Sequence, residues 1–274
     1  MSIVLLIIIG LVSAIIGSLV GIGGGIIIVP TLIYFGMTQG LLHGITPQTA
    51  IGTSSIILIA TGLSSTIGYL KVKQVDVKNG MIFLVGILPG AFIGAYLSRF
   101  LTIDSFNLYF GIFLIFVAML LMIRHKIPPI KAFQKPKYMK TFIDSHGKRY
   151  EYGVVPYIAV IASFIIGLTS GLFGIGGGAL MTPLMLLVFR FPPHVAVGTS
   201  MMMIFFSSLA GSIGHILLDH VVWGYSIILI ILSYIGAQIG VKVNKTIQSD
   251  LIVLILRIVM LVLGVYLILQ TMMG

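Results

Sequence analysis

The sequence predicts an all-α polytopic membrane protein built from two homologous halves. Of its 274 residues, 58% are hydrophobic and only 8% are charged, whereas about 25% of the residues in a typical soluble domain are charged. The mean hydropathy of +1.19 is too high for a soluble fold, which needs a polar exterior. Because a membrane span takes about 20 apolar residues, we expect about eight full transmembrane helices and two short ones.

The apolar runs give the expected elements in chain order. They are residues 3–20, 26–42, 48–70, 80–98, 105–123, 154–173, 179–191, 195–218, 222–241 and 251–270. The first run has no basic region before it and no small-residue cleavage site after it, so we expect a retained span and not a signal peptide. The second run of each half begins directly after a glycine cluster and carries a proline near its start. We therefore expect these two runs to form broken or re-entrant helices.

An internal repeat defines the two halves. The segment Gly21-Ile-Gly-Gly-Gly25 with Pro30 recurs as Gly174-Ile-Gly-Gly-Gly178 with Pro183, at an offset of 153 residues. An offset of 146 then pairs Ala50-Ile-Gly-Thr-Ser54 with Ala196-Val-Gly-Thr-Ser200. We divide the chain into a first transmembrane repeat (1–124), a basic linker (125–153) and a second transmembrane repeat (154–274). We expect the linker to be a solvated loop with room for some local structure.

The basic residues indicate the topology. The chain has 16 Lys and Arg against 6 Asp and Glu, and eight of the basic residues lie between Arg124 and Arg149. This clustering follows the positive-inside rule and does not indicate nucleic-acid binding. Five crossings per half would invert the second repeat and place fourteen basic loop residues inside, with Arg99 alone outside. Four crossings per half would make the repeats parallel, with eleven inside and four outside. We therefore favour inverted repeats with both termini outside and a cytoplasmic linker.

Several classes of chemistry find no support in the sequence. Cysteine is absent, which excludes disulfides, thiolate metal sites and cysteine nucleophiles. No nucleophile elbow or metalloprotease motif is present, and no histidine pair has metal-ligand spacing with a third ligand nearby. The carboxylates of Asp76, Asp104, Asp219 and Asp250 fall at the ends of apolar runs, so we do not expect a Na⁺ or H⁺ site built on a buried carboxylate. We expect a protein that is not an enzyme and has no metal or cofactor.

The two glycine clusters are the first candidates for a binding site. Backbone that leaves the helix inside a membrane is tolerated where it is buried in protein or lines a wet cavity. A helix that starts at such a break directs its free N–H groups and positive dipole end into it, which favours an anion. The candidate residues are Gly23, Gly24, Gly25, Gly176, Gly177 and Gly178. The alternative interpretation is that these glycines only allow close helix packing.

Hydroxyl and charged side chains extend the candidate set. Thr53, Ser54, Thr199 and Ser200 follow the breaks and provide donors for an anion, with Thr53 and Thr199 the stronger candidates; alternatively, they bond to helix carbonyls or join neighbouring helices. Arg257 lies about 10 Å into the last run, where it either attracts an anion or extends to the lipid headgroups. His215 and Gln238 are candidates for the pathway or for packing.

The repeated Gly-Ile-Gly-Gly-Gly and proline, the repeated Ala-Ile/Val-Gly-Thr-Ser and the basic central loop together resemble the TauE/SafE family of membrane permeases. The resemblance covers nearly the whole chain. It implies a multi-pass exporter of the prokaryotic plasma membrane that carries small sulfur-containing anions such as sulfite, sulfoacetate or other organosulfonates. It places the site at the six glycines of the two breaks, with the four hydroxyl residues beside them.

Our main hypothesis is a secondary anion transporter that exposes a midplane site to each face in turn as the halves rock. Its expected partners are a small anionic substrate and the lipid bilayer, with no nucleic acid; the sequence gives no oligomeric state. The alternatives are an importer or exchanger of another small solute with the same architecture, and a membrane scaffold that transports nothing.

Overall fold

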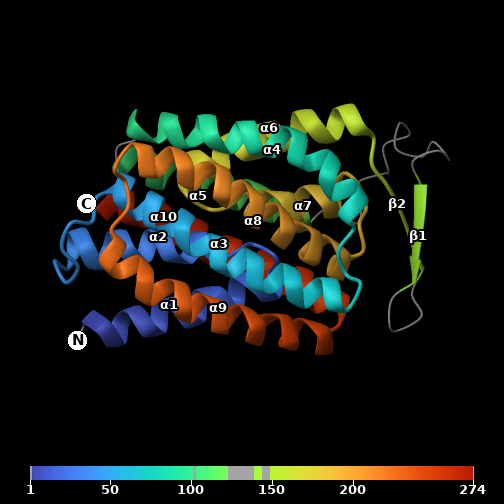
Figure 1. The fold of residues 1–274 in the computed structure, drawn as a ribbon, viewed down its shortest axis with the longest axis horizontal. Coiled ribbons are helices and arrows are strands. Elements are labelled where there is room, and N and C mark those ends of the chain that lie inside the picture. Colours follow the sequence, from blue (N-terminus) through green and yellow to red (C-terminus); the bar gives the residue numbers. More distant parts are fainter. Residues whose placement is uncertain (1, 101–102, 123–138, 144–148, 274) are drawn as a thin grey trace.

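The computed structural model describes residues 2–100, 103–122, 139–143 and 149–273, and it confirms an all-helical transmembrane part (Figure 1). The described chain forms α1 (Ser2–Val20), α2 (Gly25–Ile33), a π-helical turn (Tyr34–Thr38), α3 (Pro47–Lys71), α4 (Val77–Leu97), a 3₁₀ turn (Ser98–Phe100), α5 (Ile103–Met122), β1 (Met139–Ile143), β2 (Arg149–Gly153), α6 (Pro156–Phe173), α7 (Gly178–Leu187), α8 (Pro193–Leu217), α9 (Trp223–Thr246) and α10 (Ser249–Met273).

Six helices of the described chain are long and apolar enough to cross a membrane: α3, α4, α6, α8, α9 and α10. Each of them overlaps one of the apolar runs found in the sequence. Large apolar side chains on the outer surface, such as Val85, Ile161 and Leu217, are more than half exposed. Hydroxyl side chains such as Ser54, Thr182 and Ser207 are instead buried between helices. An apolar exterior around a partly polar interior suits a protein surrounded by lipid.

The two halves are interleaved. Helix α1 packs against α9 and α4 against α6, while α3 packs against α8 and α5 against α10. Small residues allow these helices to approach closely. A β-carbon at Gly90 of α4 would lie 2.3 Å from the carbonyl oxygen of Phe164 in α6, and one at Gly240 of α9 would lie 2.4 Å from that of Ile15 in α1. Each half therefore makes much of its helix packing with the other half.

Helices α2 and α7 are short and start at the glycine clusters. They have 9 and 10 residues, so each is about 15 Å long, about half of the hydrocarbon thickness. Gly24 and Gly177 cap them with φ of 90° and 71°, in the left-handed region that favours glycine. Pro30 and Pro183 lie inside the two helices.

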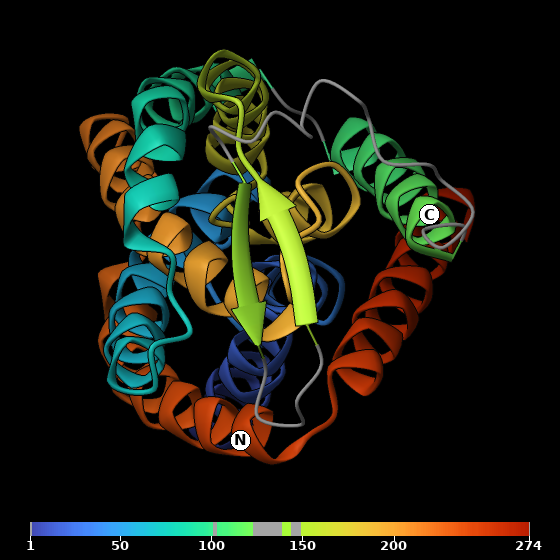
Figure 2. The same ribbon diagram turned by 90° about the vertical axis from the view of Figure 1, so that its right-hand side faces the viewer.

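The described part of the linker forms an antiparallel hairpin, in which Met139 of β1 pairs with Gly153 of β2. The hairpin lies across the middle of one end of the bundle (Figure 2). We call this end the hairpin end, and we call the opposite end, where α1 begins and α10 ends, the terminal end (Figure 1). The hairpin is local structure of the kind that the expectation for the linker allowed, and residues 125–138 and 144–148 of the linker lie outside the described residues.

Candidate functional site

The two glycine clusters, Gly21–Gly25 and Gly174–Gly178, interrupt the helices, and we call them the glycine breaks. They lie against each other between α3 and α8. A β-carbon at Gly25 would lie 2.7 Å from the carbonyl oxygen of Gly174, and one at Gly178 would lie 2.8 Å from that of Gly21. Both pairs join the first half to the second. The candidate glycines at 23–25 and 176–178 thus gather in one place, and all six are buried.

Ser54 and Ser200 bond to the break of the opposite half. The Ser54 hydroxyl donates to the Gly174 carbonyl at 2.8 Å, and the Ser200 hydroxyl donates to the Gly21 carbonyl at 2.9 Å. Thr182 of α7 also donates to the Gly21 carbonyl, at 2.7 Å. These bonds satisfy carbonyl groups that the end of a helix leaves without intrahelical partners. In this conformation both serines are engaged by the backbone of the breaks.

Thr53 and Thr199 contact the ends of other helices. The Thr53 hydroxyl accepts from the backbone N–H of Val222 at 3.0 Å, and the Thr199 hydroxyl accepts from that of Asp76 at 2.9 Å. Val222 and Asp76 are the residues that precede α9 and α4. The threonines therefore lie one residue from the serines in sequence but fix the starts of α9 and α4.

Two apolar side chains that the sequence analysis did not single out close the space between the breaks. A β-carbon at Gly23 or Gly176 would approach both Leu58 and Ile204 to between 2.9 and 3.1 Å. Leu58 and Ile204 are fully buried, and they occupy equivalent positions of the two repeats at the offset of 146. That equivalence was the available signal, but two apolar residues in apolar helices do not stand out.

The centre of the molecule combines several features that suit an anion. The first N–H groups of α2 and α7 have no acceptor within their helices, and the dipoles of both helices are positive at these ends. Hydroxyl groups of Ser54, Thr182 and Ser200 lie beside the breaks. No group of three or more His, Cys, Asp or Glu residues arranged to hold a metal ion occurs within the part of the chain that the structure describes.

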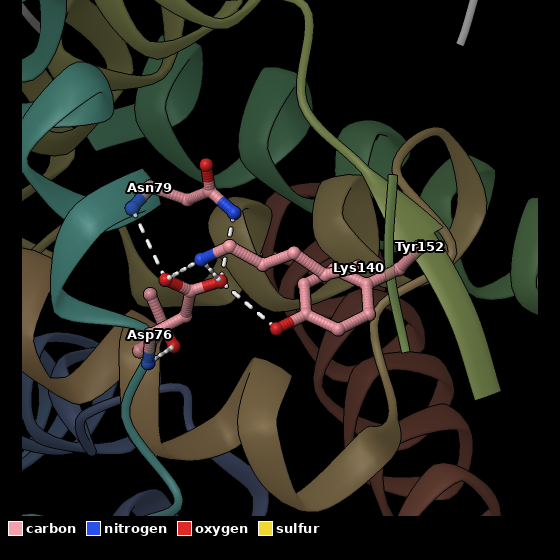
Figure 3. A network of polar contacts seen from close by, with 5 residues as sticks. Asp76, Asn79, Lys140 and Tyr152 are labelled. Atoms are coloured by element: carbon pink, nitrogen blue, oxygen red, sulfur yellow. Dashed lines mark hydrogen bonds and ion pairs between the residues drawn. The ribbon is translucent and has the colours of Figure 1, made fainter. Parts of the chain in front are cut away.

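A second polar cluster joins the hairpin to α4 (Figure 3). The Asp76 carboxylate accepts from the Lys140 ammonium group at 2.8 and 2.9 Å and from the Tyr152 hydroxyl at 2.9 Å. It also accepts from the side-chain amide and the backbone N–H of Asn79. Burial alone would raise the pKa of Asp76, but the bonds from Lys140, Asn79 and Tyr152 outweigh it and hold the pKa below its usual value. Burial, together with the Asp76 charge, raises the pKa of Tyr152.

The cluster also reaches the candidate site, because the Asp76 backbone N–H is the group that Thr199 accepts from. In the sequence Asp76 lies at the end of an apolar run, and nothing there connects it to Lys140, which lies in the basic linker. The sequence also gives His215, Gln238 and Arg257 as candidates. His215 contacts the Gly171 carbonyl at 3.1 Å, Gln238 lines a cleft between α3 and α9, and Arg257 lies in α10.

Comparisons with known proteins give the family. Residues 6–267 match the family described as "Sulfite exporter TauE/SafE". The chain is 45% identical to "Probable membrane transporter protein YunE" of Bacillus subtilis, with 98% of each chain covered. It is 30% identical to "Probable membrane transporter protein MJ0441" of Methanocaldococcus jannaschii, over 97% of this chain and 95% of that protein. It also shares 31% identity with "Sulfite exporter TauE/SafE family protein 6" of Arabidopsis thaliana, over 36% of this chain and 24% of that protein.

No solved structure matches the chain. The family match covers nearly the whole sequence, and the repeated glycine motifs form the centre of the fold. This protein is therefore a multi-pass membrane protein that belongs to the sulfite exporter TauE/SafE family.

Proposed function

We propose that the protein is a secondary transporter that exports small sulfur-containing anions, such as sulfite or organosulfonates, and holds them between the two glycine breaks. The observation that carries this proposal is the meeting of the breaks, where the starts of α2 and α7 and the backbone of both halves come together. Backbone N–H groups and hydroxyls bind an oxyanion without a compensating buried charge. The family name supports the substrate class.

The proposed architecture is an inverted repeat of ten helical segments, eight of them full spans. In support, α1 begins at the terminal end, whereas its counterpart α6 begins at the hairpin end (Figure 1). Helix α1 packs against α9, and their counterparts α6 and α4 pack against each other. This is the pattern expected when a two-fold axis relates the two halves.

We place the hairpin end in the cytoplasm of a prokaryotic cell. The described basic residues at this end are Lys71, Lys73, Lys78, Lys140, Arg149, Arg190, Lys242 and Lys245. Arg99, at the far end of α4, is the described basic residue of the terminal end. This distribution follows the positive-inside rule.

Transport would then require a change at the centre. Leu58 and Ile204 close the breaks, and Ser54 and Ser200 are engaged by the Gly174 and Gly21 carbonyls. Rocking of one half against the other would separate these pairs, because each joins the two halves. Export of a monovalent anion is favoured by an inside-negative potential, by about 2.3 kcal/mol per 100 mV.

The test is efflux of radiolabelled sulfite from proteoliposomes, with and without an imposed potential and with taurine or sulfoacetate as competitor. We expect potential-dependent efflux above that of empty liposomes. We expect the double variant Ser54→Ala and Ser200→Ala to slow efflux at least tenfold. The matched control is Thr271→Val, which removes a hydroxyl that donates to the Leu267 carbonyl of its own helix. Absence of flux from folded protein would refute the substrate, and full activity of the double variant would refute the site.

A further inference from the structure

A cleft of about 220 Å³ opens between the ends of α3 and α9 at the hairpin end. Its lining comprises Ser64, Ile67, Gly68 and Lys71 of α3, and Tyr234, Gln238, Val241, Lys242 and Lys245 of α9. The floor is rigid, because the Ser64 hydroxyl donates to the Tyr234 carbonyl at 2.9 Å and Gly68 packs against Val241. The cleft shares no lining residue with the glycine breaks or with the polar cluster around Asp76.

The described lining is strongly cationic. It contains the ammonium groups of Lys71, Lys242 and Lys245 and no carboxylate. All three lysines and Gln238 are exposed. Three like charges around one cleft repel each other, and they do so more strongly near a membrane than in bulk water because the local dielectric constant is lower. An anion in the cleft would relieve this repulsion, and the Gln238 amide would add a neutral donor.

The cleft continues into an apolar surface along both helices. Ile67 and Leu63 lie one and two turns from Lys71 on the same face of α3, and both are exposed. Ile231 lies one turn beyond Tyr234 on α9 and is 58% exposed. The charges are therefore at the helix ends, and lipid-facing apolar side chains follow toward the membrane interior. A ligand that fits both parts has an anionic head and a hydrocarbon chain.

The equivalent pair of helices, α8 and α4, shows that helix packing does not require these lysines. Helices α8 and α4 pack as α3 and α9 do. At the offset of 146, Leu217 replaces Lys71, Phe92 replaces Gln238 and Tyr96 replaces Lys242. Only Arg99, equivalent to Lys245, retains a cation, and its guanidinium group lies 4.0 Å from the centre of the Tyr96 ring. The cationic cleft is thus a property of the hairpin end alone.

We propose that this cleft binds the phosphate headgroup of an anionic phospholipid, whose acyl chain lies along Leu63, Ile67 and Ile231. Basic pockets between transmembrane helices bind such headgroups. The bound lipid would bridge α3 and α9, which belong to different halves of the molecule. The lysines contact the headgroup, while the apolar stripe distinguishes a lipid from a free phosphate.

The experiment is native mass spectrometry of the purified protein, titrated with dioleoylphosphatidylglycerol or dioleoylphosphatidylcholine. We expect the wild type to prefer phosphatidylglycerol. The variant Lys71→Gln, Lys242→Gln, Lys245→Gln should bind it about tenfold more weakly. The control Lys73→Gln, Lys78→Gln, Arg149→Gln removes the same charge from exposed residues at the same end and should change binding less than twofold. Equal losses in both variants, or equal binding of the two lipids, would overturn the proposal.

A second arm separates a lipid from free phosphate. Inorganic phosphate and glycerol phosphate are added as competitors at up to a thousandfold excess over phosphatidylglycerol. Retention of the lipid supports the proposal, because the acyl chain then contributes to binding. Displacement by equimolar inorganic phosphate would overturn it and indicate a site for the soluble anion. The substituted lysines are exposed, and size-exclusion chromatography verifies that each variant is folded.

Discussion

Single residues at the breaks are constrained by their backbone as well as by their neighbours. Gly24 has a φ of 90°, and a β-carbon there would lie 2.6 Å from the Ser13 carbonyl oxygen. Gly177 has a φ of 71°, and a β-carbon there would approach Ile87 to 3.1 Å. Larger residues at these positions are therefore strained and displace the start of α2 or α7.

We expect Gly24→Leu or Gly177→Leu to abolish anion efflux from proteoliposomes while the protein still inserts into the membrane. Insertion is favoured because the long apolar helices are unchanged. Gly224→Leu is the control, since a β-carbon at Gly224 would meet no other helix of the described chain within 4 Å and the residue is exposed. Unimpaired flux in either break variant would refute the assignment of the site.

We expect substitution of Thr53 or Thr199 to lower the free energy of unfolding. Thr53→Val or Thr199→Val leaves the N–H of Val222 or Asp76 without its acceptor, which costs about 1–3 kcal/mol at the buried Asp76 contact and less at the part-buried Val222 contact. Thr53→Ser and Thr199→Ser keep the oxygen and should restore most of this loss. The measurement is thermal unfolding in detergent, with the exposed Thr246→Val as control. If both valine variants melt like this control, the bonds do not stabilise the fold.

The repeat predicts hydroxyls beside the breaks at Thr53, Ser54, Thr199 and Ser200 and favours the two threonines, whereas in the structure the two serines bond to the break carbonyls. The sequence does not predict these bonds, since the partner carbonyls of Gly174 and Gly21 come from the opposite half. Anion binding by these hydroxyls stays a prediction. The positions of Leu58 and Ile204 at the breaks could not be predicted, because an apolar residue in an apolar helix does not differ from its sequence neighbours.

At the scale of elements, the Asp76 carboxylate joins both strands of the hairpin to α4 through Lys140 and Tyr152. Asp76→Asn keeps a side chain that caps α4 but removes the charge that Lys140 pairs with. We expect amide hydrogen exchange in residues 139–143 and 149–153 to become faster, by tenfold at most because the Lys140 side chain is 36% exposed. The control is Glu151→Gln, whose exposed partner Arg149 lies in the same strand. Equal exchange in the wild type and Asp76→Asn would show that the carboxylate does not hold the hairpin.

The same carboxylate makes the docking of the hairpin sensitive to acid. Because the folded state lowers the pKa of Asp76, its contribution is complete above the ordinary value of about 3.9 and is lost as the pH falls through the lowered pKa. Exchange of the hairpin amides, corrected for the intrinsic rate, should therefore be constant from neutral pH down to about 5 and increase only in stronger acid. In Asp76→Asn this increase should be absent. An increase between pH 7 and 5 would point to a different group.

The helices could be predicted from the sequence because a run of about 20 apolar residues indicates a segment that lies in lipid. The run 195–218 corresponds to α8 (Pro193–Leu217), and the run 48–70 to α3 (Pro47–Lys71). The hairpin could not be predicted in the same way. Its strands are five residues long within a charged segment, and their position depends on a contact with Asp76, which is distant in sequence.

At the scale of the whole molecule, the two repeats form one structural unit. Helix α1 packs on α9, α4 on α6 and α3 on α8, so the described core is made largely between halves. A two-fold exchange of similar halves explains why the Ser54 and Ser200 bonds, and the Thr53 and Thr199 bonds, occur in equivalent pairs. The two ends differ in charge: the hairpin and most described lysines lie at one end, and Arg99 at the other.

This asymmetry leads to a prediction about orientation that the absence of native cysteine makes simple to test. Single variants Arg99→Cys and Gly224→Cys lie at the terminal end, and Arg149→Cys and Lys245→Cys lie at the hairpin end; all four positions are exposed. Because positive loop charge is retained inside, we expect a membrane-impermeant maleimide to label the first two in intact cells and the last two only after permeabilisation. Labelling of Arg149→Cys in intact cells would reverse the orientation. Protection of Arg99→Cys together with Arg149→Cys would place both ends on one side, which contradicts a bundle that crosses the membrane along its helices.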